Sequence, residues 1–255
     1  MSLLRELRAD DWSRSTLAGA WTVKDVAAHL LDGDLRRLAL VRDGHAASRP
    51  ASASFDDVVA FVNEINAAGV SWGGRLSPRL LTDLLERSGE WVARHVQSLR
   101  PDAEAVLPVA WADEESSTNW MDTGREYTER WHHQMQIRDA VRAPGLLQPR
   151  WLLPLLELSV RSFRRAFRDV AAPAGTAVAF EVEDAGAWSV VREADGFVVL
   201  RGRAPRPAAS LTTDADTAWR LLYNALTPQA ARERVRVSGE ASLVEPFFGA
   251  RAVMV

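Results

Sequence analysis

The run of residues 123–139 places the strongest constraint on the fold of this chain. After its second residue it contains neither proline nor glycine, and Thr123 with Glu126 has the T-x-x-E spacing of a capping box, so we expect a helix that begins at Thr123. Glu129 and His133 are four residues apart and therefore project from one face of this helix. A carboxylate and an imidazole so arranged can supply two ligands to a metal ion, and a further ligand must come from elsewhere.

Helical spacing of apolar residues predicts three more long helices before this run. Thr22 is a good N-cap with Asp25 three residues later, and Ser54 and Ser77-Pro78 are typical helix starts. We expect a short helix at 3–17, long helices at 22–43, from 54 to a break at 69–75, and 77–99, and a connection at 100–122. Four amphipathic helices predict a four-helix bundle, in which metal sites are built from side chains on facing helices.

The period of the apolar residues changes after a boundary near Pro144-Gly145 and Pro149. We expect a helix at 151–170 and then an antiparallel meander, in which Val178, Phe180 and Val182 alternate as in a half-buried strand. A strand that becomes a helix near residue 214, a strand at 234–240 and a final helix complete this part. The predicted fold class is therefore α+β, with a four-helix bundle at 1–148 and a smaller α+β domain at 149–255.

Composition excludes several classes of function. The net charge is −3, so no polycationic surface for nucleic acid is expected. The chain contains no cysteine, which excludes disulfides, thiolate metal sites and a cysteine nucleophile, so the sulfur of any thiol chemistry must arrive on a cosubstrate. No apolar run approaches the roughly 18–20 residues of a membrane span, and no secretory signal is evident. We therefore expect a cytoplasmic protein without a membrane partner.

His29 is the candidate for the missing metal ligand. It lies at the border of the apolar face of the helix predicted at 22–43, from which a side chain can reach the bundle interior. Taken alone, such a histidine is usually structural or exposed to solvent. His29 together with Glu129 and His133 gives two imidazoles and one carboxylate on two helices, and this set leaves an open position, as catalytic zinc sites do.

Other residues offer weaker candidates. His132 is the rival ligand at i,i+3 from Glu129, and we expect it to orient the site or to lie in solvent. Glu126 could orient the site but is expected at the surface, as are His45 and His95. Trp111 and Trp120 in the long connection either line a pocket or pack ordinarily.

The segment W-T-V-K-D-V-A-A-H-L at 21–30, followed about a hundred residues later by E-R-W-H-H at 129–133, resembles the DinB/YfiT-like metal-binding bundle. More narrowly, it is similar to the mycothiol-dependent maleylpyruvate isomerase family. The resemblance implies His29, Glu129 and His133 as metal ligands and a sterol-carrier-like C-terminal domain, whose late strand V-R-V-S-G-E resembles 235–240. It also implies an arginine of that domain near the site, which neither Arg234 nor Arg236 matches securely.

This resemblance implies a thiol-dependent isomerase or transferase that acts on a small electrophilic acid, with mycothiol or another low-molecular-weight thiol as cosubstrate. We expect a divalent metal, in the first place Zn²⁺, although the ligands also suit Ni²⁺, Fe²⁺ or Mn²⁺. Two alternatives stay open: a hydrolase that uses metal-activated water at the same site, and a non-catalytic protein that binds a metal or small ligand. The sequence assigns no catalytic acid or base, no particular substrate and no oligomeric state.

Overall fold

The computed structural model describes residues 1–52 and 54–253, which fall into two compact units. The first unit contains Met1–Pro108 and Ser117–Gly145, and the second contains Val109–Ser116 and residues 146–253. The segment Val109–Ser116, which the sequence assigns to the first domain, thus groups with the second unit. Within the described residues, every helix is too short or too polar to cross a lipid bilayer.

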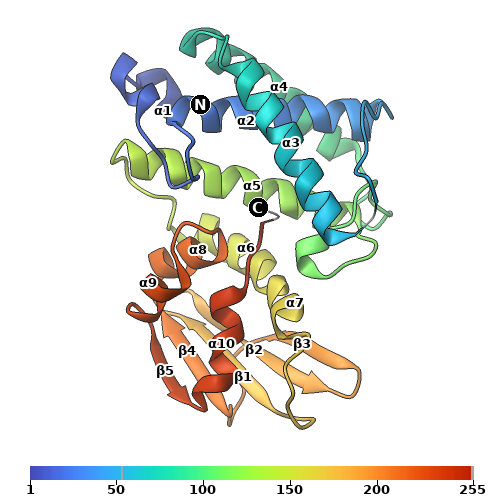
Figure 1. The fold of residues 1–255 in the computed structure, drawn as a ribbon, viewed down its shortest axis with the longest axis vertical. Coiled ribbons are helices and arrows are strands. Elements are labelled where there is room, and N and C mark those ends of the chain that lie inside the picture. The colour runs from blue at the N-terminus through green and yellow to red at the C-terminus, as the bar shows by residue number, and fades with distance from the viewer. Residues whose placement is uncertain (53, 254–255) are drawn as a thin grey trace. The chain divides into compact units, whose positions relative to one another are not determined.

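The first unit is helical, as the sequence predicts (Figure 1). The α-helices of this unit have these bounds: α1 Ser2–Glu6, α2 Val23–Arg37, α3 Phe55–Gly73, α4 Pro78–Ser98 and α5 Asn119–Ala140. Helix α2 contacts α3, α4 and α5, so it lies at the centre of the unit. Its buried residues Val26 and Leu31 share a core with Leu81 and Leu85 of α4 and with Ile137 of α5.

Local sequence signals correctly locate three helix starts. The Thr22 hydroxyl accepts a hydrogen bond from the Asp25 backbone N–H, and the Asp25 carboxylate accepts one from the Thr22 backbone, which completes a capping box for α2. Ser54 caps α3 and Ser77 caps α4 with a single hydrogen bond each, in which the serine hydroxyl accepts from a backbone N–H of the first turn. Helix α2 continues as one turn of π-helix at Leu38–Arg42, which carries the predicted helix almost to its expected end.

The predicted start of α5 is wrong. The helix begins at Asn119, and its N-cap is Thr118, whose hydroxyl accepts from the Met121 N–H. Two hydrogen bonds tie the first residue of the helix to the preceding loop. The Asn119 N–H donates to the Ala103 carbonyl, and the Asn119 side-chain amide donates to the Arg100 carbonyl. The T-x-x-E spacing at Thr123 therefore lies inside a helix whose cap is selected by contacts distant in sequence.

The break predicted at 69–75 is also wrong, because α3 continues to Gly73. Both of its last glycines are buried where α3 meets α2. A Cβ at Gly69 would overlap the Asp32 side chain, and a Cβ at Gly73 would overlap the Cβ of Ala28. These glycines are therefore needed for close helix packing and do not end the helix.

The short helix predicted at 3–17 is only partly formed. Helix α1 ends at Glu6, and a 3₁₀-helix follows at Ala9–Ser13. The helix predicted at 151–170 is divided into α6 Pro149–Ser159, a 3₁₀ turn at Val160–Ser162 and α7 Phe163–Phe167.

The second unit is α+β, as predicted, and its described residues form a five-stranded sheet with the order β3-β2-β1-β4-β5. The strands are β1 Ala177–Val182, β2 Gly186–Glu193, β3 Gly196–Arg201, β4 Ala209–Thr213 and β5 Arg236–Gly239, and the remaining helices are the 3₁₀ turn Ala110–Ala112, α8 Ala215–Leu222, α9 Pro228–Arg232 and α10 Ala241–Gly249. The predicted meander is confirmed, since β2 pairs antiparallel with β1 and β3. Strand β4 pairs with β1 in parallel and with β5 antiparallel.

The core of the second unit is aromatic. The rings of Phe163 and Phe167 lie 4.7 and 4.9 Å from the ring of Phe247, and Phe180 on β1 lies 5.0 Å from Phe163. Strand β1 is central in the sheet and is buried on both faces. Ala179 and Phe180, whose side chains point to opposite faces, are equally buried. The strand is therefore not half-buried, as its alternating pattern predicts.

Candidate metal centre

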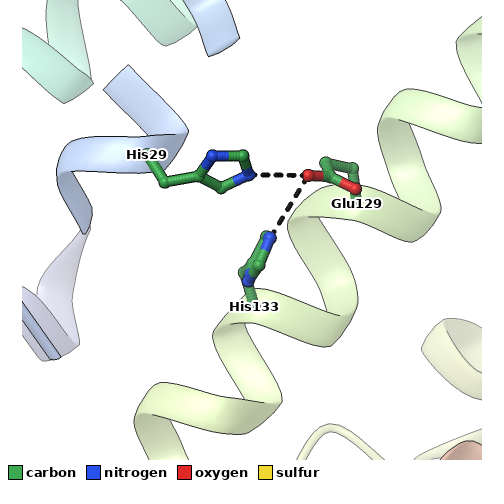
Figure 2. Close-up of side chains that lie close together, drawn as sticks. All are labelled: His29, Glu129 and His133. Atoms are coloured by element: carbon green, nitrogen blue, oxygen red, sulfur yellow. Dashed lines mark hydrogen bonds and ion pairs between the residues drawn. The ribbon is translucent and has the colours of Figure 1, made fainter. Parts of the chain in front are cut away.

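Helices α2 and α5 bring together the three residues that the sequence selects (Figure 2). His29 extends from α2, and Glu129 and His133 lie one turn apart on α5. The Oε1 atom of Glu129 lies 2.8 Å from the His29 Nε2 and 3.2 Å from the His133 Nε2. One donor atom from each residue lies within 4.8 Å of the other two, so the three side chains can bind one ion together.

The site is buried on its histidine side and open on its carboxylate side. His29 and His133 are each 5% exposed, whereas the Glu129 side chain is 34% exposed. The ring of Trp21, which precedes the α2 cap, lies 4.9 Å from the His29 ring and 6.3 Å from the His133 ring. Trp21 therefore packs against the imidazoles, and solvent or a small molecule can approach beside Glu129.

The hydrogen bond on the far side of His133 decides what its Nε2 presents to Glu129. The Nδ1 of His133 lies 2.7 Å from the carbonyl oxygen Oε1 of the buried Gln136, so Nδ1–H is the donor. In the neutral ring the Nε2 then carries a lone pair, which faces the carboxylate oxygen of Glu129 at 3.2 Å. Two acceptors so placed repel each other unless a proton or a cation lies between them, and the donor set therefore fits a divalent cation.

His29 is held differently. Among the described residues, its Nδ1 is buried and has no hydrogen-bond partner. The orientation of this ring depends on the contact of Nε2 with Glu129, on Trp21 and on the edge contact with the His133 ring at 4.7 Å between centroids. The two histidines are thus unequal, because only His133 has a side chain behind it that fixes its tautomer.

Glu129 is an anion in this environment. Burial by itself would raise the pKa of its carboxyl group, but the close contacts with His133 and His29 hold that pKa well below its ordinary value. A carboxylate that stays ionised is suited to bind a cation over the whole physiological pH range.

His132 does not lie in solvent, which corrects one part of its prediction. It is 4% exposed, its Nδ1–H donates to the Thr128 carbonyl, and its ring lies 4.0 Å from the ring of His133. Burial and the neighbouring His133 lower the pKa of His132 to about 3, so the ring is neutral. It packs against a ligand ring from one side and helps to orient it.

Glu126 is not at the surface either. It lies 3.2 Å from Arg37 of α2 and 2.9 Å from Arg125, and both arginines also pair with the fully buried Asp122 at 2.8 and 2.9 Å. These four charges alternate in sign and join α2 to α5 one to two turns before Glu129. We call Arg37, Asp122, Arg125 and Glu126 the interhelical charge cluster.

A second set of polar contacts joins α2 to α5 and to α4. Asp34 of α2 is 3% exposed, forms an ion pair with Arg130 of α5, and accepts a hydrogen bond of 2.7 Å from the Ser88 hydroxyl of α4. Together with the interhelical charge cluster, these contacts fix the position of α2 along α5 and hence the position of His29 opposite Glu129.

The remaining candidates differ in their exposure to solvent. His45 is exposed, as expected, whereas His95 on α4 is partly buried and its Nε2 has no partner among the described residues. Trp111 is buried in the second unit, and Trp120 lies on α5 in the first unit with 52% of its surface exposed. Arg236 is exposed and pairs with Glu183 at 2.6 Å.

Sequence reasoning missed Gln136 and the interhelical charge cluster. Gln136 lies three residues after His133, and this spacing alone places it beside that ring on the helix surface. Asp122 and Arg37 carry no comparable signal, because their pairing depends on how α2 and α5 cross.

Comparisons with known proteins agree with this architecture. A family model described as "Mycothiol maleylpyruvate isomerase N-terminal domain" matches residues 1–138. The crystal structures of a mycothiol-dependent maleylpyruvate isomerase and of its histidine-to-alanine mutant are each 13% identical to the chain, with a TM-score of 0.55, and each match covers 94% of this chain and 88% of the other. Identity this low shows the fold alone.

A third solved structure, a sterol carrier protein domain of Helicoverpa armigera, is 16% identical and covers 39% of this chain and 79% of its own, with a TM-score of 0.26. No curated protein shows a significant match to the chain.

Proposed function

Because the chain belongs to the mycothiol maleylpyruvate isomerase N-terminal domain family, we propose that it is a metal-dependent isomerase or transferase that uses a low-molecular-weight thiol, such as mycothiol, on a small electrophilic acid. The observation that carries this proposal is the convergence of His29, Glu129 and His133 with donor atoms that suit one divalent cation. Zn²⁺ is the ion that we propose in the first place.

The chain's own residues would hold the ion in an open site. His29 and His133 present their Nε2 atoms, and Glu129 presents a carboxylate oxygen that offsets part of the positive charge. Three protein ligands leave at least one position for another molecule, which is the arrangement of catalytic and not of structural zinc sites. When bound, the ion would supply the Lewis acidity that deprotonates a thiol at neutral pH.

The remaining site residues would orient His133 and shield the two imidazoles. Trp21 covers the two imidazoles, and Gln136 and His132 hold His133 from behind and from the side. The exposed edge of Glu129 leaves the approach for the thiol and the acid. A cosubstrate thiol that adds to the activated double bond of such an acid allows rotation about the resulting single bond, and its elimination then gives the isomer.

The lack of cysteine is consistent with this function, since no thiol of the protein competes with the cosubstrate for the ion. The chain also needs a cation to bind the carboxylate of an acid substrate, and every arginine of the interhelical charge cluster is already paired with a carboxylate. These arginines are therefore poor candidates for substrate binding.

The test is elemental analysis of the purified protein beside the His133→Ala variant, with His45→Ala as the control for an exposed histidine. We expect one divalent ion per chain in the wild type and in His45→Ala, and loss of the ion in His133→Ala. Each protein is then titrated with mycothiol, and binding is expected only in the metal-loaded proteins.

Wild-type protein that retains no metal after incubation with Zn²⁺, Ni²⁺, Fe²⁺ or Mn²⁺ would contradict the proposal. Metal binding without thiol binding would contradict its thiol-dependent part, and turnover of an amide or a thiol conjugate without added thiol would favour the hydrolase instead.

A further inference from the structure

We propose that Gln136 is a positioning residue that fixes the tautomer of His133 and thereby strengthens metal binding. The part of this inference that concerns metal binding rests on the proposed function. The part that concerns the tautomer of His133 rests on the geometry alone. Gln136 is 4% exposed, and its carbonyl oxygen lies 2.7 Å from the His133 Nδ1.

The first step of the argument concerns the choice between the two nitrogens of His133. The ring has two positions for its proton in the neutral state, and only the Nδ1–H form leaves Nε2 free to bind a metal. Without a partner at Nδ1, the proton would be drawn to Nε2, where it could donate to Glu129 at 3.2 Å. Gln136 supplies the competing acceptor on the opposite side, and the neutral ring then keeps the form that binds metal.

The second step concerns the choice of an amide at this position. A carboxylate behind a metal-binding histidine orients the ring in the same way but adds a negative charge. The site already contains the anionic Glu129, and a neutral amide orients His133 without a second buried charge. A neutral carbonyl acceptor is therefore sufficient for the orienting role.

The third step concerns the contrast with His29, whose Nδ1 has no partner among the described residues. Of the two imidazoles, only that of His133 is held in the tautomer that binds a metal when no metal is bound. The tautomer of His29 is set by Glu129, which accepts from its Nε2–H at 2.8 Å until a cation replaces that proton. Gln136 is therefore expected to act on the tautomer of His133 in the metal-free protein as well as in the loaded one.

The experiment compares Gln136→Met, which keeps the side-chain length and removes the acceptor, with Gln136→Glu, which keeps the acceptor. Gln134→Met is the matched control, because Gln134 lies on the same helix and is exposed. The first readout is the ¹⁵N NMR spectrum of the metal-free proteins, recorded at a pH at which the ring is neutral. We expect His133 in the Nδ1–H form in wild type, Gln134→Met and Gln136→Glu, and a shift towards the Nε2–H form in Gln136→Met.

The second readout is Zn²⁺ affinity, measured by competition with a chelator. We expect Gln136→Met to bind Zn²⁺ about ten- to a hundredfold more weakly than wild type, Gln134→Met to be unchanged, and Gln136→Glu to recover most of the loss. Thermal unfolding of the metal-free variants shows whether each is folded, and the tautomer of His133 in the wild type still tests the inference should Gln136→Met not fold.

Wild-type His133 in the Nε2–H form, or the same tautomer in wild type and Gln136→Met, would overturn the inference. Unchanged Zn²⁺ affinity of a folded Gln136→Met would also overturn it. If the wild type binds no metal, the proposed function fails, and the tautomer of His133 alone then decides the role of Gln136.

Discussion

Gly73 of α3 faces Ala28 of α2 so closely that a Cβ at Gly73 would overlap the Cβ of Ala28. Ala28 is the residue before the candidate ligand His29, so the approach of these two helices determines where that ligand lies. Neither atom is the end of a flexible side chain, and relief of the overlap requires a backbone shift.

We therefore expect Gly73→Ala to lower the free energy of unfolding by roughly 1–3 kcal/mol, as overpacked sites do, and to weaken metal binding through displacement of α2. The control is Gly89→Ala on α4, where an added Cβ meets no atom within 4 Å. This change is expected to stabilise the protein by up to about 1 kcal/mol, because alanine favours a helix over glycine. Urea denaturation checks both values, and equal effects of the two substitutions would refute the packing argument.

Asp122 is fully buried between Arg37 and Arg125, and Arg37 is itself only 4% exposed at its side chain. Replacement of Asp122 by asparagine leaves a buried guanidinium with Glu126 as its remaining carboxylate. We expect Asp122→Asn to destabilise the protein by roughly 3 kcal/mol, as the loss of one partner of a buried ion pair does. Chemical denaturation measures this change.

The control for that prediction is Asp102→Asn, which breaks the pair with Arg100 at 3.4 Å, where both side chains are more than three-quarters exposed. We expect little change in stability there, because exposed ion pairs contribute little. An Asp122→Asn protein as stable as Asp102→Asn would show that the interhelical charge cluster does not hold α2 against α5.

The lowered pKa of His132 leads us to expect a loss of stability in mild acid. Its pKa is about 3 in the folded protein, below its ordinary value of 6.5, so between these pH values the unfolded chain binds a proton that the folded protein does not bind. The contribution is complete above pH 6.5 and decreases as the pH falls towards 3. Its steepest slope is about 1.4 kcal/mol per pH unit for one proton.

The measurement is the free energy of unfolding of metal-free protein from pH 7.5 to pH 4, for wild type and for His132→Gln. We expect a shallower acid dependence in the variant by about one proton, and no change in His45→Gln, in which the replaced histidine is exposed. A parallel pH dependence in wild type and His132→Gln would show that His132 titrates normally.

The start of α5 gives a prediction that separates the two candidate caps. Thr118 accepts the hydrogen bond from the Met121 N–H, whereas Thr123 lies inside the helix. We expect Thr118→Ala to cost about 1 kcal/mol of stability through loss of the cap, and Thr123→Ala to cost less than about half of that. Thermal unfolding of the two variants checks the order, and a larger loss for Thr123→Ala would restore the start predicted from the sequence.

The sequence by itself determined which residues carry the candidate site and on which kind of element they lie. Helical spacing places Glu129 and His133 on one face, and the Thr22/Asp25 capping box fixes the start of the helix that carries His29. These are local properties, in which each residue is constrained by neighbours three or four positions away. The change of period after residue 149 likewise sufficed to predict the meander and the α+β class of the second unit.

Only the tertiary structure decided what these local elements meet. Gly69 and Gly73 resemble a helix end in the sequence, yet they stay helical because α2 packs against them. Glu126 has the spacing of a capping residue, yet it pairs with Arg37 from a helix 89 residues away. The 2.8 Å approach of His29 to Glu129 depends on the same crossing of α2 and α5. Contacts of this kind follow from the packing of whole helices, and the periodicity of one segment contains no information about its partner.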